Sequence, residues 1–145
     1  MLIGFRHVGI VCGDIEKAAI FYKLLGFNEV WRESESGEWL NTILGLVDGS
    51  LSTVKLKDGN GIIIELLRFN VQKNETTSRT LNERGITHIA LTVSNVGVEF
   101  ERLSAAGVKF HSEPRISGSG YAKLCFCQDT EGNEIELVEV LNKTG

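Results

Sequence analysis

Several features that would assign a chain to a membrane, a nucleic acid or a secretory route are absent from this sequence. No apolar run approaches the roughly 20 residues that a membrane-spanning helix needs. The first residues lack the basic segment and apolar stretch of a signal peptide. Basic residues are outnumbered, with 15 Lys and Arg against 19 Asp and Glu and a net charge of −4. We therefore expect neither a membrane nor a nucleic acid as the main partner, while an anionic small substrate remains open.

Cysteine is also scarce. The three cysteines, Cys12, Cys125 and Cys127, form an odd number and no zinc-type spacing. Cys125 and Cys127 would share one face of a strand, so we expect them to be small buried hydrophobic residues rather than a disulfide. This usage of cysteine is typical of a reduced, cytoplasmic protein.

What the sequence does contain is an internal repeat. His7 and His88 each open an apolar segment, each is followed by a helical pattern, and each has a glycine 19 residues later. Each half then ends in an apolar strand pattern with one acid inside it, Glu65 in the first and Glu136 in the second. The 145 residues, 42% of them hydrophobic, suit one compact domain or two small fused modules.

The helical patterns begin and end with matching signals. Asp14 and Asn95 stand at the same offset from the two histidines, and both residue types are good N-caps. Gly26 and Gly107 stand where a helix commonly ends. The apolar positions between these signals recur at helical spacing: Ile15, Ala18, Ala19, Tyr22 and Leu25 in the first half, and Val96, Phe100, Leu103 and Ala106 in the second.

Short apolar segments bounded by turn residues predict the strands. In the first half they cover 3–12, 27–32, 39–46, 52–56 and 62–69, and in the second half 86–93, 108–111, 121–127 and 134–141. We expect an α+β fold in which a βα unit and two or three antiparallel strands occur twice. Module one spans 1–69 and module two 86–145, joined by a linker over 70–85 with a short helix near 78–84.

The two histidines and the two strand acids form a plausible set of metal ligands. Imidazole nitrogen and carboxylate oxygen suit divalent Ni, Co, Mn, Fe or Zn. Glu65 and Glu136 lie within apolar strands, where a carboxylate without a partner is strongly disfavoured, and a shared cation would remove that cost for both. The alternative is that each acid points to solvent from a half-exposed strand. The repeated spacing favours a site built from His7, Glu65, His88 and Glu136.

The chain resembles the vicinal oxygen chelate superfamily, which includes glyoxalase I, methylmalonyl-CoA epimerase, extradiol dioxygenases and the bleomycin and fosfomycin resistance proteins. The resemblance covers nearly the whole chain. One departure is Thr130, which replaces the usual proline of a turn and affects no ligand. The motifs that carry it are HVGIV at 7–11, FY at 21–22, LGF at 25–27, GITHIA at 85–90 and DTEGNEIEL at 129–137.

The resemblance implies two tandem βαβββ modules that form a curved mixed sheet around a central metal site. It implies one divalent ion per site (Ni, Co, Mn, Zn or Fe), with His7, Glu65, His88 and Glu136 as ligands. A glyoxalase- or epimerase-like lyase or isomerase would stabilise an enediolate by chelation. A glutamate at the metal would move the proton next to the carbonyl, Glu136 being the first choice and Glu65 the second.

Two other activities remain open. An Fe- or Mn-dependent extradiol-type dioxygenase would use only His7, His88 and Glu136, so the acid at position 65 favours the four-ligand isomerase interpretation. A non-enzymatic binding or resistance protein of the bleomycin type lacks the ligand set and is the least favoured.

The expected partner is a small molecule, with a glutathione or CoA thioester or hemithioacetal as the leading class. We expect a homodimer, with the site completed either within one chain or across the interface. His111 has no partner at a ligand offset and is expected to be a surface or core residue. An anionic end of the substrate could meet one of four basic residues: Arg32, Lys55, Arg68 and Lys123.

Overall fold

The computed structural model describes residues 1–70 and 80–141, and the chain divides into two compact units, Met1–Glu75 and Thr76–Gly145. The prediction of an α+β fold with two tandem βαβββ modules is confirmed, because each unit pairs one mixed four-stranded sheet with a helix after its first strand. Residues 71–79 of the predicted linker, including the start of its predicted helix, lie outside the described residues. Residues 80–85 form turns instead of a helix.

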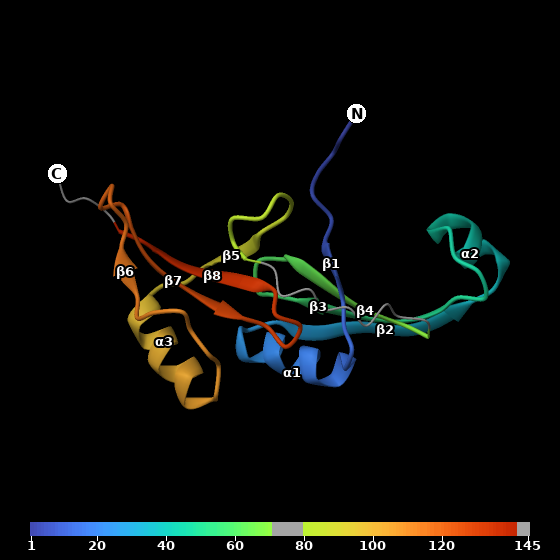
Figure 1. Cartoon of the computed structure of the whole chain (residues 1–145), viewed down its shortest axis with the longest axis horizontal. Helices are drawn as coiled ribbons and strands as arrows, with labels where there is room; N and C mark the ends of the chain where they lie inside the picture. Colours follow the sequence, from blue (N-terminus) through green and yellow to red (C-terminus); the bar gives the residue numbers. More distant parts are fainter. Residues whose placement is uncertain (71–79, 142–145) are drawn as a thin grey trace. The chain divides into compact units, whose positions relative to one another are not determined.

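The first unit has a sheet with the strand order β1-β4-β3-β2 (Figure 1). β1 runs parallel to β4, and the other neighbours are antiparallel. α1 packs against β3 and β4. The elements are β1 (Val8–Val11), α1 (Ile15–Leu24), β2 (Asn28–Ser36), α2 (Glu38–Leu44), β3 (Ser50–Lys57) and β4 (Ile63–Phe69).

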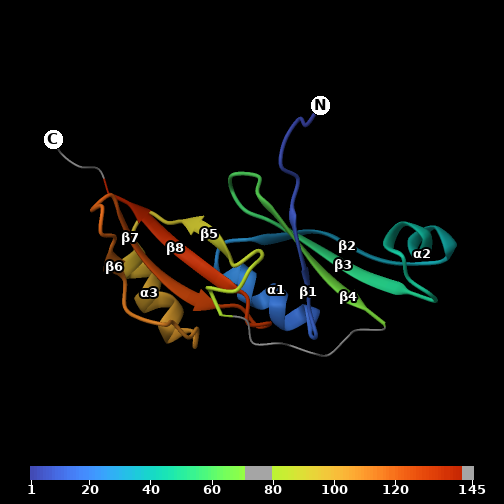
Figure 2. The same cartoon turned by 45° about the horizontal axis from the view of Figure 1, so that its top comes forward.

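The second unit repeats this topology with the order β5-β8-β7-β6 (Figure 2). β5 runs parallel to β8, and α3 packs against β7 and β8. None of the helices in the described ranges has the length and hydropathy of a membrane span. The elements are β5 (His88–Thr92), α3 (Val96–Ala105), β6 (Arg115–Ile116), β7 (Ala122–Gln128) and β8 (Glu134–Val140).

The two long helices begin and end as the sequence predicts. Asp14 Oδ1 accepts the N–H groups of the next turn at 3.1 Å, and Asn95 Oδ1 accepts from Val98 at 3.0 Å. Gly26 and Gly107 have φ of +93° and +89°, a conformation that side chains with a Cβ rarely adopt. Both signals are local in sequence, and therefore both could be recognised there.

The helix-facing side of each sheet is the core. In the first unit Val54, Leu56, Ile64 and Leu66 are at most 1% exposed, and they pack beneath α1. The strand alternation then turns the residues between them to the opposite face. The second unit does the same with a set that includes both strand cysteines: Cys125, Cys127, Ile135 and Leu137. Cys125 and Cys127 are buried and form no disulfide with each other, as predicted.

The strand predicted over 39–46 is wrong, because this segment forms α2. Its apolar residues suit a helix with one buried side chain, Leu40, and the run is too short for its pattern to distinguish a helix from a strand. Gly37 and Gly45, with φ of +111° and +65°, mark the two ends. α2 lies at the far end of β2 and β3 (Figure 1).

Two other predicted strands are shorter than expected. Of the strand over 3–12, only Val8–Val11 forms β1. Since Val8 lies opposite Ile64 and β4 begins at Ile63, β4 offers no neighbour to the residues before His7. Of the strand over 108–111, only one bridge from Phe110 to Cys127 forms. β6, which the sequence did not predict, supplies the fourth strand of the second sheet.

Candidate metal centre

In the first unit, the parallel pairing of β1 with β4 brings His7 to Glu65. Gly9 lies directly opposite Glu65, and His7 precedes Gly9 by two residues on the same face. The His7 Nε2 atom lies 3.1 Å from Glu65 Oε2, and the glutamate side chain is only 15% exposed. The carboxylate is thus largely covered, as the apolar strand pattern predicts.

The second unit builds the same pair in the same way. Ala90 lies opposite Glu136, and His88 precedes Ala90 by two residues. The His88 Nε2 atom lies 3.2 Å from Glu136 Oε2, and the glutamate side chain is 17% exposed. The His88 Nδ1 atom lies 2.8 Å from Thr87 Oγ1. If this nitrogen donates to Thr87, the Nε2 lone pair is left for a ligand.

These donor pairs fit a divalent cation in chemistry and spacing. Two ligands that bind one ion at about 2.1 Å and at right angles lie about 3 Å apart, which matches both His–Glu distances. Within 1–70 and 80–141, no group of three or more His, Cys, Asp or Glu side chains is close enough to hold a metal. Each unit therefore supplies two donors, and a four-ligand site would need both.

The two glutamates differ in what surrounds their second oxygen. Glu65 Oε1 lies 3.3 Å from the ammonium of Lys55, which stands opposite it in β3. Phe126 occupies the corresponding place opposite Glu136, and its ring packs edge-on against His88 with the ring centres 5.4 Å apart. No residue among those described donates to Glu136 Oε1. Glu136 thus has a free oxygen, whereas both oxygens of Glu65 are engaged.

The basic residues considered for an anionic substrate have different surroundings. Lys55 pairs with Glu65, as described above. The Arg32 guanidinium pairs with Glu16 and Glu29 at 2.6 and 2.8 Å. The hydrogen bond from Arg32 lowers the pKa of Glu29, although both groups are largely solvated. The charge of Arg32 is therefore already balanced.

His111 is a surface residue, as expected, with its side chain 51% exposed, and it has a close ionic partner that the sequence analysis missed. Its Nε2 atom lies 2.8 and 3.0 Å from the two carboxylate oxygens of Glu134. Gln128 Nε2 donates to Glu134 Oε1 at 2.7 Å, and the glutamate side chain is 7% exposed. The sequence contains one signal for this cluster. Glu134 precedes Glu136 by two residues, so both acids lie on one face of β8.

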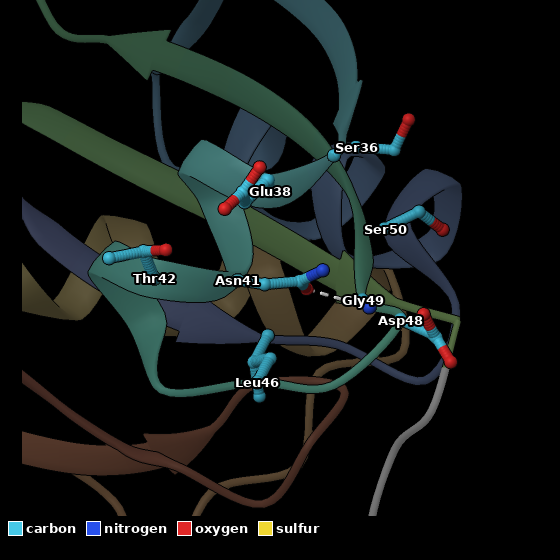
Figure 3. Close-up of a pocket in the computed structure, with 9 residues that line it drawn as sticks. Ser36, Glu38, Asn41, Thr42, Leu46, Asp48, Gly49 and Ser50 are labelled. Atoms are coloured by element: carbon cyan, nitrogen blue, oxygen red, sulfur yellow. Dashed lines mark hydrogen bonds between the residues drawn. The ribbon is translucent and has the colours of Figure 1, made fainter.

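The first unit has a separate hollow beside α2, with a volume of about 600 Å³. Figure 3 shows Asn41 on α2 reaching across it, with Asn41 Oδ1 accepting the Gly49 N–H at 2.8 Å. A Cβ at Gly49 would lie 3.0 Å from that same oxygen, so glycine keeps the hydrogen bond short. This contact fixes the loop between α2 and β3.

Comparison with known proteins gives consistent results. The model of the glyoxalase/bleomycin resistance protein/dioxygenase superfamily matches residues 4–137. A probable lactoylglutathione lyase from Synechocystis is 27% identical over 139 residues, which cover 94% of this chain and 95% of that protein.

Solved structures agree with this result. A glyoxalase family protein from Bacillus cereus is 25% identical and superposes with a TM-score of 0.88 over 98% of this chain and 97% of its own. The fosfomycin resistance protein FosX from Listeria monocytogenes, complexed with Mn(II) and sulfate, is 19% identical with a TM-score of 0.63. It covers 97% of this chain and 95% of its own, and its likeness concerns the fold.

Proposed function

Because the chain belongs to the glyoxalase/bleomycin resistance protein/dioxygenase superfamily, we propose that it is a metal-dependent enzyme of the glyoxalase and epimerase type. It would be a lyase or isomerase that moves a proton on a carbon next to a carbonyl. The observation that carries the proposal is the His–Glu pair, which each unit builds at the same register position. His7, Glu65, His88 and Glu136 would hold one divalent ion.

A bound divalent cation would act as a Lewis acid that stabilises negative charge on the substrate's oxygens. The chain must then supply the group that removes and returns the proton. Glu136 suits this role because its Oε1 atom has no partner among the described residues, whereas Lys55 and His7 engage both oxygens of Glu65. The low exposure of Glu136 also keeps water from competing for the proton.

The proposed substrate class follows from the lactoylglutathione lyase relative. The hemithioacetal of methylglyoxal and glutathione is the first compound to assay, and methylmalonyl-CoA is the second. We further propose that the enzyme is a cytoplasmic homodimer. The buried Cys125 and Cys127, which form no disulfide with each other, are compatible with a reducing compartment.

The test uses protein loaded in turn with Ni, Co, Mn, Zn and Fe(II). Turnover of either substrate with at least one metal is expected. Glu136→Gln should lower kcat by roughly 10²- to 10⁴-fold, the usual contribution of a general base. Glu101→Gln, an exposed substitution on α3, is the matched control and should leave kcat unchanged. The absence of turnover with every metal, or full activity of Glu136→Gln, would refute the proposal.

A complementation experiment addresses how the site is completed. His7→Ala and His88→Ala chains should each be inactive. If the site is shared across a dimer, mixing the two variants restores part of the activity, since one interface then holds both intact halves. If each chain completes its own site, the mixture stays inactive.

One observation favours a second candidate, an extradiol-type dioxygenase. Lys55 already neutralises Glu65, which leaves His7, His88 and Glu136 as a two-histidine, one-carboxylate set typical of Fe(II) oxygenases. Oxygen uptake by the Fe(II)-loaded protein with a catechol would support this activity. Inactivity with a range of catechols, together with metal loss in Glu65→Ala, would refute it.

A further inference from the structure

The second unit contains a cavity of about 410 Å³ that the proton transfer proposed above does not use. Its lining includes the His111–Glu134–Gln128 cluster and also Arg115 and Phe126. Because the Phe126 ring also contacts His88, the cavity adjoins the His88–Glu136 pair. The volume is in the range of small-molecule sites, which are usually apolar with a few polar groups.

The fold itself does not need this polar cluster. Counting from the glycine that ends each helix, the counterpart of His111 in the first unit is Val30. In the sheet register, Ile63 of the first unit corresponds to Glu134 of the second. Ile63 lies opposite Lys57, whereas Glu134 lies opposite Gln128. The first unit therefore builds the same sheet position without a buried carboxylate. A buried Glu134 costs desolvation that the duplicate avoids, which indicates a role in binding.

The cluster holds one imidazole nitrogen in place and leaves the other free. Glu134 accepts from His111 Nε2 and from Gln128, so that the buried carboxylate is fully satisfied. In the part of the chain that the structure describes, His111 Nδ1 has no hydrogen-bond or ion-pair partner. A hydroxyl suits this nitrogen in either protonation state, because it donates to a neutral imidazole and accepts from a protonated one.

Arg115 supplies the charge. It lies on β6, next to β7, and its guanidinium has no ion-pair partner within 1–70 and 80–141. An unpaired guanidinium on a cavity wall suits a carboxylate, which it can bind through two parallel hydrogen bonds. The rest of the lining is mostly apolar, with two hydroxyl groups: Leu81, Leu124, Cys125 and Phe126, together with Thr80 and Ser112.

We propose that this cavity binds a hydroxylated carboxylic acid with an apolar body, its carboxylate on Arg115 and its hydroxyl on His111 Nδ1. Glu134 is the positioning residue that orients His111. The assignment of this acid as part of the substrate rests on the proposed function, whereas binding to the cavity can be measured without it.

The test compares three probes that differ by one group: 3-phenyllactate, 3-phenylpropionate and 3-phenyllactamide. Binding is measured by calorimetry and by amide shifts in ¹⁵N spectra, with metal-free and metal-loaded protein. We expect phenyllactate to bind with shifts at Arg115 and Phe126. Phenylpropionate should bind roughly three- to tenfold more weakly, because one hydrogen bond is lost. Phenyllactamide should bind at least tenfold more weakly, because its charge is lost.

Variants separate the roles of the residues. Arg115→Met should weaken the binding of phenyllactate at least tenfold. Lys109→Met removes a cation outside the cavity and should leave this binding unchanged. Glu134→Gln should lower the affinity for phenyllactate to that for phenylpropionate. The affinity for phenylpropionate itself should not change. If Glu134 had a merely structural role, its substitution would weaken the binding of both ligands together.

Equal binding of the three probes, no binding, or shifts confined to other residues would overturn the cavity assignment. The failure of the proposed function has a different signature. If the protein binds the three probes in the expected order of affinity but binds no metal, only the enzymatic proposal is refuted. If the metal-loaded protein is active but binds the three probes with equal affinity, only the cavity assignment is refuted.

Discussion

Replacing Lys55 with methionine should strengthen metal binding. The Lys55 ammonium lies 3.3 Å from Glu65 Oε1, so it competes with a cation for that carboxylate and repels the ion once bound. Charge-assisted hydrogen bonds contribute about 1.5–3 kcal/mol when buried, and exposed ion pairs about 0.2–1 kcal/mol. The two side chains are 26% and 15% exposed, between these limits. We therefore expect a change of about 1.4 kcal/mol, or roughly tenfold in Kd.

The assay is competition with a chromophoric chelator, using the metal that the wild-type protein binds best. The metal-free variant should also lose about 1 kcal/mol of unfolding free energy in urea, because Glu65 loses a partner. Lys57→Met removes the same charge from the same face of β3, where no ion pair forms among the described residues, and it serves as the control. Weaker metal binding by Lys55→Met, or equal gains from both variants, would refute the reasoning.

Three further predictions concern stability. Ile135→Ala, at a core position with 0% exposure, should lower the unfolding free energy by about 2–5 kcal/mol in urea, whereas Val140→Ala at 64% exposure should change it by less than about 0.5 kcal/mol. Asp14→Ala should cost about 1 kcal/mol in the same assay, because two N–H groups of α1 lose their acceptor; no loss would contradict the capping role. Burial raises the pKa of the Cys127 thiol to about 12 from 9.0. The unfolded chain therefore releases this proton first, so stability should fall as the pH rises from 9 toward 12, and Cys127→Ala should reduce that fall.

Local signals in the sequence predicted the long helices well. Asp14 and Asn95 cap helices through contacts two or three residues away, and Gly26 and Gly107 have the positive φ that ends them. The repeat also singled out the histidines and glutamates of the two pairs, whereas strand alternation alone left the face of each acid undecided.

What the sequence could not give depends on partners far away in the chain. The segment 39–46 has an apolar pattern too short to distinguish a strand from a helix, and its two bounding glycines, Gly37 and Gly45, became informative only with their φ values. The pairing of His111 with Glu134 joins residues 23 apart, with β6 and β7 between them in the chain. Lys55 reaches Glu65 through the register of β3 and β4, which no single segment specifies.

The stoichiometry of metal binding tests the central proposal most directly. The proposal is that the His7–Glu65 pair and the His88–Glu136 pair bind one metal ion together. A titration of metal-free protein, followed by elemental analysis, should give one divalent ion per chain. His7→Ala and His88→Ala should each abolish that binding, since two donors alone hold an ion poorly. Two ions per chain, or an ion that survives either substitution at full affinity, would contradict a site composed of His7, Glu65, His88 and Glu136.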